Sequence, residues 1–183
     1  MTDAADESQP PVRDIHAPAP GVEVPSHYAQ CYGCGVEQES GLRVRVVAGS
    51  DLTVRGEMAV CEVHQGAPGL MHGGVLAAAF DEVLGALSWL LMRPAVTASL
   101  TVDFRAPVRV GDLLSIDARV DGIDGRKVSC SGIGRNEEGA VLATASGLFI
   151  QVPIEHFARH GRKQDVDKAA KSVRSRPWME IGP

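Results

Sequence analysis

A long, mostly apolar stretch over residues 73–92 constrains the fold more than any other part of the sequence. Its composition predicts a helix that is apolar on nearly every side and ends before Pro94. Such a helix is either buried in protein or inserted in a membrane. The adjacent acids Asp81 and Glu82 lie near its middle, and an Asp at the centre of a bilayer costs about 2.5 kcal/mol or more. We therefore expect a buried core helix and no membrane span.

Segments in which apolar and polar side chains alternate flank this helix on both sides. A period of two is typical of half-buried strands. Two such segments precede the helix and four follow it, at residues 42–47, 52–60, 97–105, 114–121, 127–134 and 141–152. Short turns join them, one of them at residues 122–125. The pattern predicts an α+β fold in which a curved antiparallel sheet wraps around one long central helix. Such a sheet leaves an open edge, and dimerisation would cover it.

The charge distribution divides the chain into a folded centre and two tails. Residues 1–30 carry a net charge of −4 and five of the 11 prolines, which is typical of an extended, poorly packed arm. Residues 154–183 carry a net charge of +3 and are expected to form a basic tail with one helical turn near residues 156–160. The folded domain is therefore predicted to span residues 31–153.

The overall composition excludes several classes of protein. A net charge of −5 over 183 residues argues against general nucleic-acid binding. The acidic start lacks the apolar segment of a signal peptide. Four cysteines are too few for a disulfide scaffold in a chain of this length. We therefore expect a cytoplasmic protein with reduced thiols.

The sequence His72-Gly73-Gly74 opens the predicted helix, and Asp81 follows nine residues after the histidine. A Gly/Pro loop at residues 65–69 precedes this motif, and the strand 97–107 follows the helix. With these features the chain resembles the hot-dog-fold acyl-CoA thioesterases, in the branch of the phenylacetate-pathway enzymes and the human thioesterase superfamily members. The resemblance covers residues 31–152. It implies hydrolysis of an acyl- or aryl-CoA without a metal or redox cofactor, by a homodimer or homotetramer with sites at the subunit interface.

The residues around the motif support the chemistry that the resemblance implies. Gly73 and Gly74 place unpaired N–H groups at a helix start, where they would hold the oxyanion of a thioester under attack. Asp81 is a carboxylate in an apolar helix, which is costly without a function or a partner. In the family the matching acid activates water as a general base or attacks the thioester, and both routes stay open here. In a rival assignment, Glu82 is the functional acid and Asp81 is merely paired.

Further site residues follow from the resemblance. His72 would orient the turn or contact the thioester, and Thr97 would help to hold the water, usually from the neighbouring subunit. The acyl chain is expected in an apolar tunnel between helix and sheet, near Phe80 and Leu84. Gln65 is a candidate for positioning the water. The bases that would meet the phosphates of coenzyme A are Arg105, Arg109, Arg126, Lys127 and Arg135.

Two cysteine motifs allow a different interpretation. Cys31 and Cys34 form a CxxC motif, and Cys61 and His64 form a CxxH motif. Together these three cysteines and one histidine could bind a zinc ion tetrahedrally. The alternative is a pair of reduced thiols beside the first strand, and we assign no metal to the reaction. A protein that binds acyl-CoA or another apolar ligand without hydrolysis, and a zinc-organised interaction module, remain the competing functions. A hydratase is disfavoured because its Asp/His motif is missing.

Overall fold

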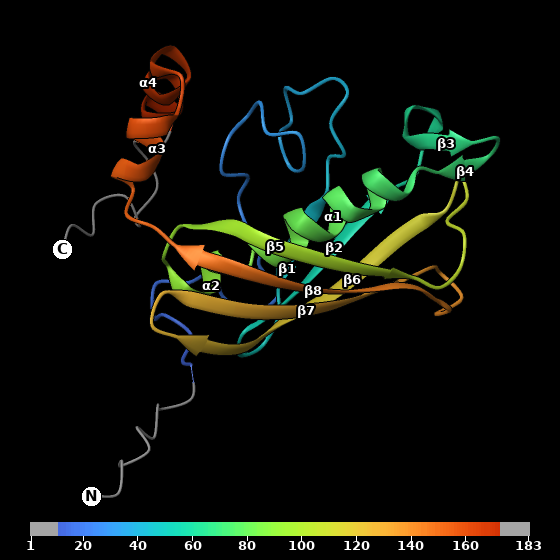
Figure 1. Cartoon of the computed structure of the whole chain (residues 1–183), viewed down its shortest axis with the longest axis horizontal. Coiled ribbons are helices and arrows are strands. Elements are labelled where there is room, and N and C mark those ends of the chain that lie inside the picture. The colour runs from blue at the N-terminus through green and yellow to red at the C-terminus, as the bar shows by residue number, and fades with distance from the viewer. Residues whose placement is uncertain (1–10, 173–183) are drawn as a thin grey trace, which may run out of the picture.

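A single antiparallel sheet forms the scaffold of the protein in the computed structural model, which describes residues 11–172. Its six strands lie in the order β1-β2-β6-β7-β8-β5 (Figure 1). Their bounds are Arg45–Ala48 for β1, Thr53–Ala59 for β2, Ala95–Phe104 for β5, Leu113–Asp124 for β6, Lys127–Arg135 for β7 and Val141–Gln151 for β8. The sequence prediction of an antiparallel sheet with one helical layer is confirmed, and β1 and β5 are its two edges.

The apolar stretch forms the helical layer on one face of this sheet (Figure 1). It consists of α1, Gly73–Gly85, and the short α2, Ser88–Leu91, so the predicted single helix is interrupted after Gly85. The helical region ends at Met92, whose left-handed backbone (φ 50°) precedes Pro94. By length and composition alone, Gly73–Leu91 is apolar enough to cross a membrane, but more than half of it is buried inside the fold.

Helix and sheet approach each other closely because glycines on the sheet face the largest helix side chains. Phe80, Val83 and Leu84 are all at most 1% exposed. A Cβ atom built on Gly134 would lie 3.1 Å from the Phe80 ring. A Cβ atom on Gly56 would lie only 2.3 Å from Val83, which is closer than real contacts allow. The abundance of glycine in the strands is therefore a packing requirement of α1.

Two turns differ from the sequence prediction. The loop at residues 65–69 is a small hairpin of β3, Gln65–Ala67, and β4, Leu70–Met71, preceded by the 3-10 helix η1, Glu62–His64. Strand β6 continues through the predicted turn 122–125 as far as Asp124, with a bulge that shifts its register between Val120 and Gly122. The actual turn is tighter, and Gly125 occupies it with a positive φ of 55°.

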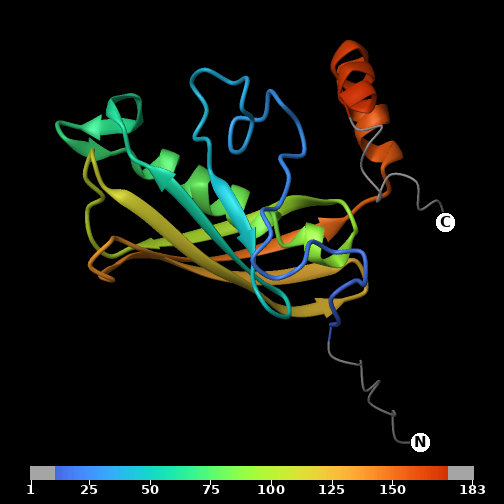
Figure 2. The same ribbon diagram turned by 180° about the vertical axis from the view of Figure 1, so that it is seen from behind.

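The predicted poor packing of the N-terminal arm is wrong for the part of it that the structure describes. The Val24 N–H donates to the Val46 carbonyl at 2.8 Å, and the Asp14 N–H donates to the Leu90 carbonyl at 2.9 Å. The arm therefore covers the β1 edge and contacts the end of α2. The following segment lies beside α1 in both views (Figures 1 and 2). Residues 1–10 lie outside the described part of the chain.

Two helices follow the sheet at the C-terminal end. The predicted turn near residues 156–160 is confirmed as α3, Glu155–His160. A second helix, α4, Lys163–Ser172, was not predicted from the sequence. Arg162 and Asp165 form an ion pair at its first turn. The rest of the predicted basic tail, residues 173–183, lies outside the described residues.

Candidate functional site

Asp81 meets Thr97 on the outer side of α1. The Thr97 hydroxyl donates a hydrogen bond of 2.7 Å to Oδ1 of the Asp81 carboxylate. Both residues belong to the same chain, so the expectation that Thr97 comes from a neighbouring subunit is wrong for this contact. One carboxylate oxygen is held in this way, and the contact leaves Oδ2 for another ligand. The buried apolar helix thus carries a carboxylate with a fixed orientation.

A bulge in β5 produces this contact. The register between β5 and β8 shifts between Thr97, opposite Phe149, and Ser99, opposite Leu148. A bulge re-aims side chains that strict alternation would place elsewhere. Thr97, Ala98 and Ser99 are consequently all exposed, against the alternation that the sequence predicted. The bulge therefore breaks the strand pattern at the residue that bonds Asp81.

Asp81 and Thr97 line a cleft of about 1000 Å³ between α1, the start of β5 and the segment of residues 23–36. Glu82 and Trp89 line it from the helical layer, and Phe157 of α3 lines it from the C-terminal side. The segment of residues 23–36 contributes further walls. Three parts of the chain that are distant in sequence therefore meet around the carboxylate.

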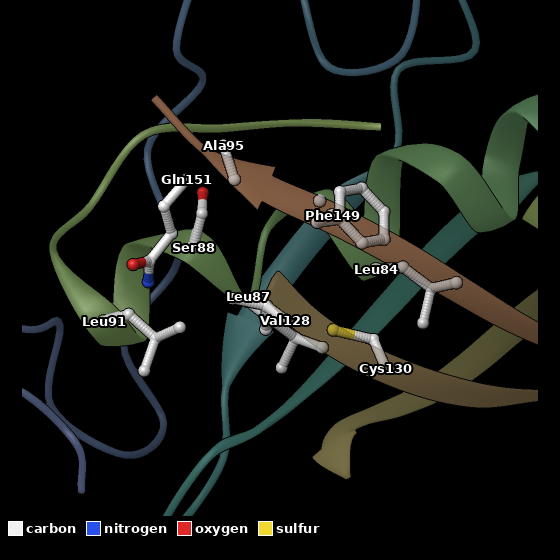
Figure 3. A pocket seen from close by; sticks show the side chains of 10 residues that line it. Leu84, Leu87, Ser88, Leu91, Ala95, Val128, Cys130, Phe149 and Gln151 are labelled. Atoms are coloured by element: carbon white, nitrogen blue, oxygen red, sulfur yellow. The ribbon is translucent and has the colours of Figure 1, made fainter. Parts of the chain in front are cut away.

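The expected apolar tunnel between helix and sheet is absent from the described part of the chain near Phe80 and Leu84. Phe80 is 0% exposed and Leu84 is 1% exposed, and neither lines the large cleft. The cavity beside Leu84 holds only about 10 Å³, less than one water molecule needs. Figure 3 shows Leu84, Leu87, Val128 and Phe149 closing around it. Both candidates are core residues, because the glycines of the sheet let α1 pack without a gap.

The two glycines at the start of α1 were predicted to offer two free N–H groups, and one of the two is available. His72 is the N-cap, and its Nδ1 accepts the Gly74 N–H at 2.9 Å. The Gly74 amide is therefore already used, and His72 orients the turn. Among the described residues the Gly73 N–H has no acceptor, so Gly73 provides the donor that is available to a ligand.

The Gly73 amide and Asp81 are too far apart within one chain to contact the same carbonyl. They are separated by eight helical residues, which corresponds to about 12 Å along a helix axis. A thioester carbon and its oxygen lie little more than 1 Å apart, so a site that uses both groups needs them from two copies of the chain.

Comparisons with known proteins identify the family of the chain. The sequence profile of the thioesterase superfamily matches residues 68–143. A protein of Pseudomonas aeruginosa that is named as an esterase is 35% identical to this chain over 91 residues. The match covers 48% of this chain and 67% of that protein. The chain belongs to the thioesterase superfamily. A solved structure of another thioesterase superfamily protein has a TM-score of 0.64 and 29% identity, covering 74% of this chain and 70% of that one. The hot-dog fold is therefore established for this superfamily member.

The acyl-coenzyme A thioesterase THEM4 of Xenopus laevis is 39% identical over 89 residues. The match covers 48% of this chain and 40% of that protein. The chain thus spans about two fifths of the length of this relative. Asp81, Thr97 and the glycines of the helix start all lie within the matched superfamily region.

Two other predicted site residues of this superfamily member lie outside the cleft. The Gln65 amide donates to the Glu62 carboxylate at 2.6 Å and accepts the Gly69 N–H at 2.7 Å, so it stabilises the β3–β4 hairpin. Arg105 is exposed and lies 3.7 Å from Asp103. Neither residue lines the cleft around Asp81.

The second acid of the helix contacts a different group of residues. The Cys31 thiol lies 3.4 Å from Oε2 of Glu82, and His27 Nδ1 lies 3.9 Å from Oε1. Burial raises the pKa of Glu82 from 4.5 to about 7. Asp81 and Glu82 thus point to different partners, as their offset of about 100° on a helix requires. His27 was not among the residues predicted from the sequence, although it lies four residues before Cys31.

Proposed function

We propose that this chain hydrolyses acyl-CoA thioesters to the free acid and coenzyme A. The hydrogen bond between Thr97 and Asp81, in a cleft large enough for a substrate, is the observation that carries the proposal. Relatives named as acyl-coenzyme A thioesterases support it. A protein of the same fold from Streptococcus mutans was crystallised with acetyl-CoA bound, which supports a coenzyme A ligand.

In the proposed reaction, Asp81 accepts a proton from water while the water oxygen attacks the thioester carbon. Thr97 holds Oδ1, so Oδ2 is the oxygen that takes the proton. The oxyanion that forms accepts a hydrogen bond from a Gly73 amide. Collapse of the tetrahedral intermediate breaks the carbon–sulfur bond, and the thiolate of coenzyme A leaves and takes up a proton. The proposed reaction thus uses Asp81 as the base, Thr97 to orient it, and Gly73 as the donor to the oxyanion.

We propose that the working form is a homodimer with each site shared between two copies. The separation of about 12 Å between Gly73 and Asp81 on one helix supports this arrangement. Strand β5 supports it as well, because it is a sheet edge of 10 residues with mostly exposed side chains. Pairing of two β5 edges would cover them and bring the two α1 helices together. A tetramer and the cytoplasmic location stay predictions.

Asp81 has a second available role, as a nucleophile that forms an acyl-aspartyl anhydride. Single-turnover hydrolysis in ¹⁸O-labelled water detects an anhydride that water opens at the Asp81 carbonyl carbon. Direct attack by water places the label in the product acid during the first turnover. If water opens the anhydride at Asp81 itself, the first turnover releases unlabelled acid.

The test of the proposal is the release of free thiol from a panel of aliphatic and aryl CoA thioesters. We expect steady turnover on at least one of them and a loss of about 10²- to 10⁴-fold in kcat for Asp81→Asn. Asp124→Asn, an exposed acid at the end of β6, is the matched control and should retain the rate. A chain that binds the thioesters without releasing thiol above background would instead be the non-catalytic binding protein.

A further inference from the structure

Four side chains that the proposed hydrolysis does not use converge beside α1. His27, Cys31 and Cys34 come from the segment that lies along the helix, and Glu82 comes from α1 itself. One ligand atom from each residue lies within 4.8 Å of those of all the others. Three side chains that can bind a metal lie on a loop of eight residues. They meet Glu82, which follows 48 residues after Cys34.

Three of the separations between these residues are close to the edges of a tetrahedron around zinc, and all four ligand atoms lie within 4.8 Å of one another. Zn–S bonds of about 2.3 Å and Zn–N or Zn–O bonds of about 2.0–2.2 Å imply ligand–ligand distances of roughly 3.3–3.8 Å. The Cys34 sulfur lies 3.4 Å from His27 Nδ1, and the Cys31 sulfur lies 3.4 Å from the Glu82 carboxylate. His27 Nδ1 lies 3.9 Å from the same carboxylate. The cluster is therefore close to the right size for a single ion.

The charges of the cluster also favour a cation. Two thiols and a carboxylate share a half-buried site in which His27 is the only basic member, so the cluster can supply up to three anionic ligands to a cation. A divalent ion would stabilise all three anions at once, because metal ligands bind in their deprotonated forms.

The backbone around the cysteines is shaped to present both sulfurs to the cluster. The Gly33 N–H lies 3.3 Å from the Cys31 sulfur, and the Ser26 hydroxyl lies 3.3 Å from the Cys34 sulfur. Such outer contacts orient metal ligands. A Cβ on Gly35 would lie 2.4 Å from the Ala29 carbonyl oxygen, so the turn accepts only glycine there. The loop is thus built around the cysteine pair.

We propose that His27, Cys31, Cys34 and Glu82 bind one Zn²⁺ ion as a structural site. With four protein ligands the site is closed, and a closed site stabilises a fold rather than activating water. The ion would fasten the segment of residues 27–34 to α1 at the residue next to Asp81. This segment forms one wall of the cleft, so the ion would fix the shape of that wall.

The four residues considered from the sequence as a zinc set do not come together in the fold. Among the described residues, Cys61 and His64 do not join the cluster around Cys31 and Cys34. The two residues contact each other instead, with the Cys61 sulfur 3.5 Å from His64 Nδ1. The actual partners of the CxxC are His27 and Glu82, and Cys61 provides a natural control.

Elemental analysis of the full-length chain, purified without a metal-binding tag, tests the proposal. We expect about one zinc per chain in the wild type and in Cys61→Ser. We expect a loss of at least tenfold in bound zinc for Cys31→Ser and Cys34→Ser. Zinc retained by the Cys31→Ser/Cys34→Ser double variant would overturn the proposal. A stable disulfide between Cys31 and Cys34 in freshly isolated wild-type protein would overturn it as well.

Titration of the chelator-treated wild type with Co²⁺ needs no variant and so avoids any folding defect. We expect saturation at one equivalent, with a thiolate-to-cobalt charge-transfer band and the strong visible absorption of tetrahedral cobalt. Equimolar Zn²⁺ should displace the cobalt and remove both bands. An apoprotein that binds neither ion under reducing conditions refutes the site, whether or not the chain hydrolyses thioesters.

Discussion

The Thr97 hydroxyl donates to the Asp81 carboxylate at 2.7 Å, from a strand bulge to the middle of a helix. The contact joins β5 to α1 at the cleft and leaves Oδ2 as the carboxylate oxygen for the proposed reaction. Removing the hydroxyl should therefore impair the chemical step more than substrate binding.

We expect Thr97→Val to lower kcat by about 10- to 100-fold, because a hydrogen bond to a charged group contributes about 1.5–3 kcal/mol. Thr97→Ser keeps the hydroxyl and should restore most of the rate. The measurement is steady-state thiol release, with kcat and KM determined separately. Equal rates for the valine and serine variants would show that the hydroxyl does not position Asp81.

The Gly73 amide can be removed without breaking the helix. Gly73 is the first residue of α1, where proline is well tolerated, and its neighbour His72 has the extended backbone (ψ 134°) that a following proline requires. We expect Gly73→Pro to lower kcat by about 10²- to 10³-fold, as the loss of an oxyanion donor does. Gly73→Ala retains the N–H and should stay close to the wild type in thiol release.

Mixing inactive variants tests whether the site is shared between copies. A heterodimer of Gly73→Pro and Asp81→Asn subunits contains one site with both intact groups. Random co-assembly should therefore restore about a quarter of the wild-type activity. Co-expression with two different tags allows the heterodimer to be isolated. If the mixture is no more active than its parents, the two groups do not meet across the interface.

The close approach of β2 to α1 predicts a cost in stability. In Gly56→Ala the new methyl group would lie 2.3 Å from Val83, and we expect a loss of about 1–3 kcal/mol in the free energy of unfolding. Gly56→Ala combined with Val83→Ala should be less destabilised than the sum of the single variants, since the colliding atoms are gone. Urea unfolding checks this, and strict additivity would contradict the packing.

His64 makes the fold sensitive to acid. Burial lowers the pKa of this side chain below its ordinary 6.5, so below that pH the unfolded chain binds a proton that the folded chain resists. This part of the stability is present above pH 6.5 and is lost as the pH falls toward the lowered pKa. His64→Asn keeps an acceptor for the Cys61 N–H and should flatten the decline in stability as the pH falls below 6.5.

Urea midpoints measured across this pH range give the comparison. His16→Asn is the control, because His16 is exposed, and its pH profile should follow that of the wild type. A His64→Asn profile as steep as that of the wild type would assign the acid sensitivity to other groups.

Local patterns determined most of the fold in advance. The period of two located every strand of the main sheet, and the apolar stretch located the helical layer, because these patterns report which side chains must be buried. Asp81 was identified as a candidate site residue for a related reason, since a carboxylate in an apolar helix is costly unless it has a function or a partner. The alternation failed at Thr97, where a bulge that depends on the neighbouring strand β8 changed the register.

Tertiary packing decided which face of the helix meets the sheet and which residues join the cysteine pair. The pattern of a single segment does not carry this information. A helix that is apolar all round does not reveal which face meets the sheet, so Phe80 and Leu84 were expected along the substrate and are buried in the core instead. The cysteine motif showed that a ligand set was available but not which distant residues would complete it. The contact between this loop and α1 brings in Glu82, 48 residues after Cys34, and the fold of the loop itself brings His27 to the same place.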